Sequence, residues 1–362
     1  MNKSFRILAI NPGSTSTKFG VYDDTKEVLS KTLRHSTEEL SPFPHITSQY
    51  QFRKEVIVSA LKEAGLSLDS FSAIVGRGGL LYPVEGGTYK VNDIKAEHLL
   101  QGVQGEHASN LGGLLAREIA KEAGNIPAFI VDPVVVDEME PIAKLSGHPL
   151  ITRRSIFHAL NQKACARKAA EKLGKAYNEV NLIVAHMGGG ISIGAHKQGR
   201  VIDVNNALNG DGPFAPERSG GLPAADLAKL CFSGKYTLGE VMDMLRGKGG
   251  MVAYLGVNDV RDAKARIKQG DEKAKLVYEA MAYQVAKEIG LLAVVLEGKV
   301  DAIVLSGGIA FDEIFINLIR KRTDWIAPAL IFPGEEEMEA LVEGGLRVLK
   351  GEEPAKEYKP KI

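Results

Sequence analysis

Residues 5–32, FRILAINPGSTSTKFGVYDDTKEVLSKT, contain three short apolar segments separated by polar turns. We expect strands over Phe5–Ile10, Lys18–Tyr22 and Val28–Thr32, because turn-forming Gly, Pro, Asn and Asp residues lie between them. Residues 181–205, NLIVAHMGGGISIGAHKQGRVIDVN, repeat the order of strand, glycine turn, strand, polar turn and strand. Each stretch therefore predicts a three-stranded antiparallel meander.

A second pair of segments follows the meanders in the same order. Phe71–Leu80 is similar to Val300–Ile309, and each is an apolar strand that ends in a Gly-Gly pair. Two repeats in one order indicate a duplicated architecture. With helices between the strands, this predicts an α/β protein of two similar domains. We expect the first domain over residues 1–150 with the C-terminal helix 335–362, and the second over 151–334.

The expected helices show apolar residues at three-and-four spacing. They cover Phe52–Ala64, Ser109–Ala123, Ser155–Leu173, Ala224–Cys231, Leu238–Leu245, Glu272–Leu296, Ile314–Arg322 and Glu335–Leu349. A last strand is expected at Ala329–Phe332. The segment Ser36–Tyr50 is typical of a long loop, and Gly351–Ile362 of a loosely held tail.

The composition excludes several classes of function. With 45 basic and 45 acidic residues, the net charge is zero, so no strong field would attract nucleic acid or a membrane surface. Cys165 and Cys231 are far apart and form no Cys/His cluster, which argues against a disulfide scaffold and a structural zinc site. No stretch reaches the roughly 20 apolar residues of a membrane span. We expect a cytoplasmic protein without nucleic-acid or membrane partners.

Glycine-rich turns are the candidate phosphate-binding features. The chain has no GxxxxGK[ST] motif and no GxGxxG that opens a helix after a strand, which argues against P-loop and Rossmann binding. Instead, Pro12–Lys18, Met187–Ile191 and Leu305–Ile309 each follow an apolar strand. Glycine lets the backbone approach a phosphate, and successive N–H groups form an anion-binding nest. The first turn adds the hydroxyl groups and charge of Ser14, Ser16 and Lys18.

These turns carry a resemblance to a known family. Ile10–Lys18 resembles the first phosphate motif of the acetate kinase family, within the actin/hexokinase/Hsp70 ATPase superfamily. His186–Gly190 resembles the second phosphate motif, and Ser306–Ile309 the adenosine motif. Further landmarks of the family occur in the expected order at Asp132, Phe157-His158 and Pro216–Gly221. The resemblance extends over nearly the whole chain, and the variants are most similar to the butyrate kinase branch.

The resemblance implies a fold, an activity and partners. The fold would be two duplicated actin-like (ribonuclease H-like) domains with a nucleotide cleft between them. The activity would be the reversible phosphorylation of butyrate, or a related short or branched-chain fatty acid, by Mg-ATP. ATP/ADP and Mg²⁺ would be the cofactors, and the chain would form a homodimer or a higher homo-oligomer. The turn Gly308–Asp312 departs from the Gly-Ile-Gly-Glu-Asn type of acetate kinases, so the adenine contacts there stay open.

The resemblance also assigns roles to individual residues. Arg77 and Arg218 would hold the acyl substrate and the transferring phosphoryl group, because guanidinium groups bind carboxylate and phosphate oxygens in pairs. His158 would donate an N–H to the transition state, and His107 matches a second family histidine. The expected metal-binding residues, with Asp132 also counted as catalytic, are Asn11, Asp132 and Glu336. The expected nucleotide-binding residues are Ser14, Ser16, Lys18, His186, Gly188, Gly189, Gly190, Ser306, Gly307 and Gly308.

The preferred acid is predicted from two glycines. Gly78 and Gly79 follow Arg77, where acetate kinases tend to have bulkier residues, so we expect an enlarged acyl pocket and a preference for butyrate and isobutyrate over acetate. The alternatives are an acetate or propionate kinase, a sugar kinase of the same superfamily with Asp132 as its base, and a non-catalytic nucleotide switch. The cationic set of Arg77, Arg218 and His158 exceeds what a neutral sugar requires.

Overall fold

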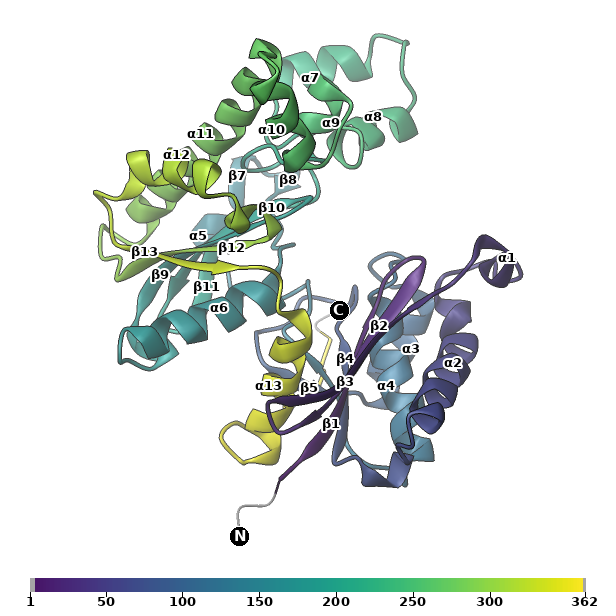
Figure 1. The fold of residues 1–362 in the computed structure, drawn as a ribbon. Coiled ribbons are helices and arrows are strands. Elements are labelled where there is room, and N and C mark those ends of the chain that lie inside the picture. The colour runs from purple at the N-terminus through teal and green to yellow at the C-terminus, as the bar shows by residue number, and fades with distance from the viewer. Residues whose placement is uncertain (1–3, 361–362) are drawn as a thin grey trace. The chain divides into compact units, whose positions relative to one another are not determined.

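The computed structural model describes residues 4–360 and divides the chain into two compact units (Figure 1). Unit 1 comprises Met1–Val136 with Glu336–Ile362, and unit 2 comprises Asp137–Glu335. The domain assignment made from the sequence, with boundaries near residues 150 and 335, stays a prediction. Each unit is built around one sheet.

The sheet of unit 1 has the strand order β3-β2-β1-β4-β6-β5. Its strands are β1 (Arg6–Pro12), β2 (Ser16–Asp23), β3 (Lys26–Arg34), β4 (Ala73–Arg77), β5 (Thr88–Lys90) and β6 (Ala128–Val131). Strands β1, β2 and β3 pair antiparallel, which confirms the first predicted meander. Strands β1, β4 and β6 run parallel, so their carboxyl ends lie along one edge of the sheet.

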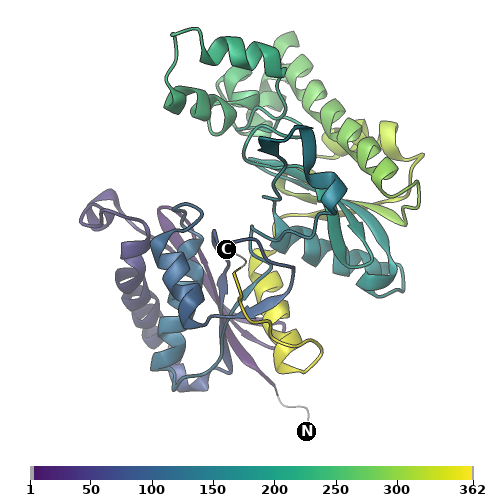
Figure 2. The same cartoon turned by 180° about the vertical axis from the view of Figure 1, so that it is seen from behind.

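Helices cover both faces of this sheet. Helices α2 (Tyr50–Glu63), α3 (Asp93–Gln101) and α4 (Asn110–Glu122) lie on one side, and α13 (Glu337–Leu349) lies on the other (Figures 1 and 2). Side chains alternate along the strands: Leu8 and Ile10 belong to the core under α2 and α4. On the opposite face α13 packs closely, since a Cβ at Gly345 would lie 2.8 Å from Val75 and 3.3 Å from Ile7.

The sheet of unit 2 repeats the order, as β11-β10-β9-β12-β13. Its strands are β9 (Asn181–Met187), β10 (Ile191–Lys197), β11 (Arg200–Val204), β12 (Ala302–Gly307) and β13 (Ala329–Pro333). Strands β9, β10 and β11 form the second predicted meander, and β12 lies parallel to β9 as β4 lies parallel to β1. The predicted duplication is thereby confirmed.

Two layers of helices also enclose the second sheet. Helix α6 (Ala159–Lys172) packs with Leu182 and Val184, whereas α11 (Glu272–Val295) shares a core with Ile183 and Ala185. The alternation places successive residues of one buried strand on opposite faces. Helix α12 (Glu313–Thr323) packs on the same face of the sheet as α11. The other elements of unit 2 are α5 (Pro141–Lys144), β7 (Leu145–His148), β8 (Ile151–Thr152), α7 (Ala224–Cys231), α8 (Leu238–Leu245), α9 (Gly250–Leu255) and α10 (Val260–Lys268).

Several predicted boundaries were wrong. The expected loop Ser36–Tyr50 contains α1 (Thr37–Leu40), which Ser36 and Glu39 cap reciprocally, and a short 3-10 turn at Thr47–Gln49. The expected helix over Ser155–Leu173 begins only at Ala159. Helices α3, α5, α9 and α10 were not predicted.

The C-terminal tail is held firmly rather than loosely. Lys356 forms a bridge with Tyr89, and Tyr358 is only 2% exposed. The Tyr358 hydroxyl accepts a hydrogen bond from the Tyr82 backbone at 3.3 Å and lies 3.0 Å from Nδ1 of His98. The tail therefore completes unit 1, although residues 361–362 of the predicted tail lie outside the described residues. Within residues 4–360, no helix is long and apolar enough to cross a membrane.

Replacing Tyr358 by alanine should destabilise unit 1 by about 3 kcal/mol, because a large buried ring and its hydroxyl contacts are lost. Urea unfolding followed by circular dichroism measures this. Lys359→Ala is the matched control: its side chain is exposed, so its effect should stay within about 0.5 kcal/mol. Equal stability of the two variants would contradict the docked tail.

Candidate active site

In unit 1, three predicted site residues lie at the carboxyl edge of the parallel strands. Asn11 is the penultimate residue of β1, Arg77 ends β4, and Asp132 directly follows β6. The parallel register places Ile10 beside Gly76, and Arg77 beside Val131. Ligands of open α/β sheets bind at such edges. The structure therefore places these three residues along one edge.

Glu337 joins two of these residues. Its Oε2 accepts a hydrogen bond from Asn11 Nδ2 at 2.6 Å, and its Oε1 pairs with Nη1 of Arg77. Both partners of the ion pair are largely shielded, with 18% and 15% of their side chains exposed. Glu336, the residue predicted from the sequence, is exposed and has a left-handed backbone with φ of 40°. The acidic residue that the structure brings to Asn11 is thus Glu337.

Asp132 is held in place by the backbone. It is 2% exposed, and its Oδ1 accepts a hydrogen bond from the Gly87 N–H at 2.6 Å. Its own φ of 36° lies in the left-handed region, which Asp tolerates better than most residues. Among residues 4–360, no three His, Cys, Asp or Glu side chains cluster as a metal cage. Mg²⁺ does not require one, because it keeps several waters and binds through one or two carboxylates near substrate phosphates.

Arg53, which the sequence analysis missed, organises the first glycine turn. Its guanidinium donates to the carbonyl groups of Gly13, Ser14 and Ser16 at 2.7, 2.7 and 2.9 Å. Burial lowers the pKa of Arg53 to about 10, which still leaves it charged at neutral pH. With the backbone held in this way, Ser14 and Lys18 are exposed and Ser16 is half-buried.

In unit 2, two histidines from different elements stack on each other. His158 occupies the position before the first residue of α6, without a side-chain capping hydrogen bond, and His186 lies in β9; their ring centroids are 4.0 Å apart and the planes differ by 23°. Nδ1 of His158 lies 2.8 Å from the Ser192 hydroxyl. The structure therefore brings together a residue expected to be catalytic and one expected to bind nucleotide.

Asn161 ties His186 to the neighbouring strand ends. Its Oδ1 lies 2.8 Å from Nδ1 of His186 and accepts a hydrogen bond from Ser306 Oγ, also at 2.8 Å. Its Nδ2 donates to the Glu335 carbonyl at 2.7 Å. Three segments, at the ends of β9 and β12 and after β13, thus meet at one buried amide of α6.

Arg218 lies against the glycine turn between β9 and β10. A Cβ at Gly190 would overlap its guanidinium, so only glycine leaves room for the arginine there. Nη1 of Arg218 donates to the Ala207 carbonyl at 2.6 Å, and burial lowers the pKa of Arg218. The ordinary pKa of a guanidinium is so high that the group stays protonated at neutral pH even after this decrease. Arg218 thus places a partly buried positive charge beside the Gly188–Gly190 turn.

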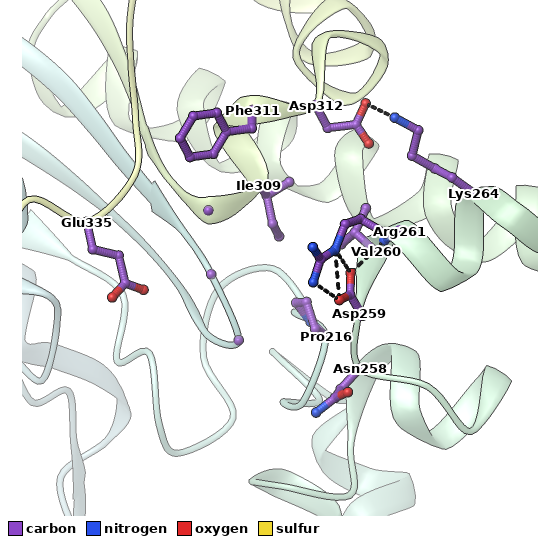
Figure 3. A pocket seen from close by; sticks show the side chains of 13 residues that line it. Pro216, Asn258, Asp259, Val260, Arg261, Lys264, Ile309, Phe311, Asp312 and Glu335 are labelled. Carbon is purple, nitrogen blue, oxygen red and sulfur yellow. Dashed lines mark hydrogen bonds and ion pairs between the residues drawn. The ribbon is translucent and has the colours of Figure 1, made fainter. Parts of the chain in front are cut away.

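A pocket of about 690 Å³ opens beside this turn (Figure 3). Phe311 and Ile309 line one side, and α10 contributes the opposite side. Gly308 faces open space, whereas Gly307 has φ of 88° and its Cβ would overlap the Met187 backbone. The residues that line the pocket are Gly188, Gly189, Pro216, Asn258, Asp259, Val260, Arg261, Lys264, Gly308, Ile309, Phe311, Asp312 and Glu335.

Four charged residues of this pocket form two ion pairs. Arg261 binds Asp259, and Lys264 Nζ lies 2.7 Å from Oδ1 of Asp312 (Figure 3). Asp312 also caps α12 and accepts a hydrogen bond from the Tyr278 hydroxyl at 2.9 Å. Phe311, in contrast, is 70% exposed and presents an open aromatic surface. Helix α10 was missed from the sequence, although Asp259 and Asp262 are signals of a helix start.

The pocket predicted at Gly78 and Gly79 is contradicted. A Cβ at Gly79 would lie 2.5 Å from the Asn110 Cα, and one at Gly78 would lie 2.5 Å from the Pro133 Cβ. These glycines allow the chain to pack against α4 and the segment after β6, so the space that their missing side chains would take is filled by the protein itself. His107, the second family histidine, has its Nδ1 2.8 Å from the Ser109 hydroxyl at the start of α4.

Comparison with known proteins identifies the family. The model of the acetokinase family matches residues 141–319. The chain is 59% identical to "Butyrate kinase 1" of Clostridium acetobutylicum over 355 residues, which cover 98% of this chain and 100% of that protein. It is 57% identical to "Butyrate kinase 2" of the same organism, covering 98% and 99%. The chain belongs to the acetokinase family.

The family resemblance found in the sequence is thereby confirmed. The fold of this chain is similar to the crystal structure of Porphyromonas gingivalis acetate kinase, with a TM-score of 0.77 and 19% identity over 95% of this chain and 100% of that one. The predicted fold class, a duplicated actin-like α/β protein, is confirmed as well. The roles of the individual site residues stay predictions.

Gly190→Ala should lower phosphoryl-transfer turnover by roughly 100-fold, because the added methyl group displaces the Arg218 guanidinium and removes one charge-stabilising donor. A coupled assay with ATP and butyrate measures this. Gly290→Ala in α11 is the control, since nothing lies within 4 Å of the added Cβ. Equal turnover of the two variants would contradict the placement of Arg218.

Proposed function

We propose that this chain transfers the γ-phosphoryl group of Mg-ATP reversibly to the carboxylate of butyrate or a related short or branched-chain fatty acid. The observation that carries the proposal is the identity of 57–59% to two proteins named butyrate kinase, over 98% of the chain. It favours this reading over an acetate or propionate kinase and over a sugar kinase. The preference for butyrate rests on this similarity, because the two glycines once expected to enlarge the pocket do not do so.

The reaction requires charge control more than acid–base chemistry. A carboxylate is already ionised near neutral pH, so one of its oxygens can attack the γ-phosphorus without a general base. The bond to the β,γ-bridging oxygen breaks, ADP leaves, and an acyl phosphate forms without net proton transfer. Such transfers depend on positioning and on neutralising charge at the phosphoryl oxygens. The main barrier is repulsion between the carboxylate and the triphosphate.

Unit 2 has the features of a nucleotide site. The pocket volume of about 690 Å³ falls in the range of small-molecule sites, roughly 300–1,000 Å³. In this proposal the base lies against Phe311 and Ile309, because an exposed ring offers a stacking surface. The phosphates extend to the backbone N–H groups of Gly188–Gly190 and to Ser306, Gly307 and Gly308. Ser14, Ser16 and Lys18 of unit 1 stay predicted phosphate-binding residues.

Arg218 and His158 would stabilise the transition state. Arg218 lies beside the glycine turn and stays charged despite its burial. Because the surroundings of a buried charge have a lower dielectric constant than water, its interaction with phosphoryl oxygens would be stronger than in water. His158 stacks on His186 and would donate an N–H to an equatorial oxygen. Arg77 would bind the carboxylate of the acid. Its Nη1 pairs with Glu337, so the acid would bind the remaining N–H groups of the guanidinium.

The strand edge of unit 1 suits a magnesium ion. Asp132 and Asn11 offer hard oxygen atoms there, and Glu337, rather than the exposed Glu336, is hydrogen-bonded to Asn11. Bound Mg²⁺ would neutralise charge on the β- and γ-phosphate oxygens. Asp132 would orient the ion through water. Cytoplasmic localisation and homo-oligomeric assembly stay predictions.

The proposal predicts trapped acyl phosphate with short-chain acids. With Mg-ATP and hydroxylamine, butyrate and isobutyrate should yield more hydroxamate per unit time than acetate. A panel of linear and branched C2 to C5 acids, with glucose as a parallel acceptor, measures this. Preference for acetate would move the chain to the acetate kinase reading, and phosphorylation of glucose without hydroxamate would support a sugar kinase instead.

A further inference from the structure

A chain of hydrogen bonds leads from half-buried Tyr177 through buried side chains to half-buried His158 within unit 2. The Tyr177 hydroxyl lies 2.7 Å from Nδ1 of His196, and Nε2 of His196 lies 3.0 Å from Oε1 of Gln162. Nε2 of Gln162 lies 2.8 Å from the Ser192 hydroxyl, which in turn lies 2.8 Å from Nδ1 of His158. Gln162, Ser192 and His196 are fully buried.

The directions of these bonds follow from groups that can only accept or only donate. Gln162 Nε2 also lies 2.9 Å from the Ser192 carbonyl, which can only accept, so the amide N–H₂ must point to Ser192. The amide oxygen therefore faces His196. Burial, followed by the charges of Lys163 and Arg167, lowers the pKa of His196 well below its ordinary value, so the ring is neutral. It must donate from Nε2 to the oxygen, which leaves Nδ1 to accept from Tyr177.

The same logic determines how Ser192 binds His158. Its hydroxyl oxygen already accepts from Gln162, and also faces the His158 backbone N–H at 3.4 Å. Its one proton is left for Nδ1 of His158. A neutral His158 then carries its own proton on Nε2, the nitrogen that can donate an N–H elsewhere.

The backbone leaves room for this arrangement at Gly194. A Cβ there would lie 2.7 Å from Oε1 of Gln162 and 3.4 Å from Nε2 of His196. A larger residue at position 194 would therefore push the side chains of Gln162 and His196 apart. The chain of bonds depends on Gly194 as well as on its polar members.

We propose that Ser192 and Gln162 are positioning residues that hold neutral His158 as its Nε2–H tautomer. The inference rests on the proposed function in one respect, namely that His158 donates an N–H to the transferring phosphoryl group. Ser192 and Gln162 act through His158 and do not touch the substrate. A neutral tautomer with its proton on Nδ1 would present a lone pair, which repels phosphoryl oxygens.

The first test measures the tautomer of His158 directly, and it does not depend on the activity of any variant. Long-range ¹H–¹⁵N spectra of ¹⁵N-histidine-labelled protein distinguish the two nitrogens of each ring, and His158→Ala assigns the signal. The expected result is neutral His158 protonated on Nε2 in the wild type, and a mixture of tautomers in Ser192→Ala. A wild-type ring protonated on Nδ1 would overturn the proposal.

The second test is kinetic. Ser192→Ala should lower kcat by roughly tenfold with KM values nearly unchanged, the effect of one lost hydrogen bond in the transition state. In a His158→Ala background, Ser192→Ala should lower kcat no further, because the imidazole that Ser192 positions is absent. Thr323→Val, which removes a buried hydroxyl of α12 far from this network in sequence, is the control and should keep wild-type kcat.

The outcomes separate the two proposals. Wild-type turnover in His158→Ala would refute the catalytic role of His158, and the positioning role with it. Impaired His158→Ala with unimpaired Ser192→Ala would refute only the positioning role, as would an equal cost of Ser192→Ala in both backgrounds.

Discussion

The buried amide of Asn161 is the interaction on which the candidate site of unit 2 depends. It connects His186 in β9, Ser306 in β12 and the Glu335 carbonyl after β13, all at distances of 2.7–2.8 Å. Parallel strands bury both faces, so polar groups can emerge only where the strands end. Asn161 fixes these ends against α6. The stacked histidines, the glycine turn and the wall of the pocket are positioned as a consequence.

In unit 1 the strand ends are also held together by one side chain, but this side chain is charged. There Glu337, at the start of α13, binds Asn11 of β1 and Arg77 of β4. An amide suffices in unit 2, where the groups to be held are neutral or polar. A carboxylate is suited to unit 1, where one of the groups is a guanidinium. The two edges have the same topology, with the Asn161 amide at the centre of one and the Glu337 carboxylate at the centre of the other.

Local features of the fold could be predicted from the sequence, and long-range partners could not. Strand alternation and glycine turns depend on neighbouring residues, so both meanders and most helices were recognised. Asn161 and Ser306 are 145 residues apart, and Asn11 and Glu337 are 326 apart, so no spacing rule connects them. A weak signal did exist, since Asn161 and Gln162 lie at buried positions of the otherwise alanine-rich α6. Gly79 shows the opposite error, because a glycine needed for close packing has the same sequence signature as one that opens a pocket.

In the mechanism proposed above, the strand ends of unit 2 hold the nucleotide. A crystal structure with bound Mg-ADP tests it most directly. We expect phosphate oxygens within hydrogen-bonding distance of the Gly188–Gly190 backbone, and the adenine ring against Phe311 in the pocket that α10 completes. Phosphates bound away from this turn, or an adenine outside the pocket, would contradict it.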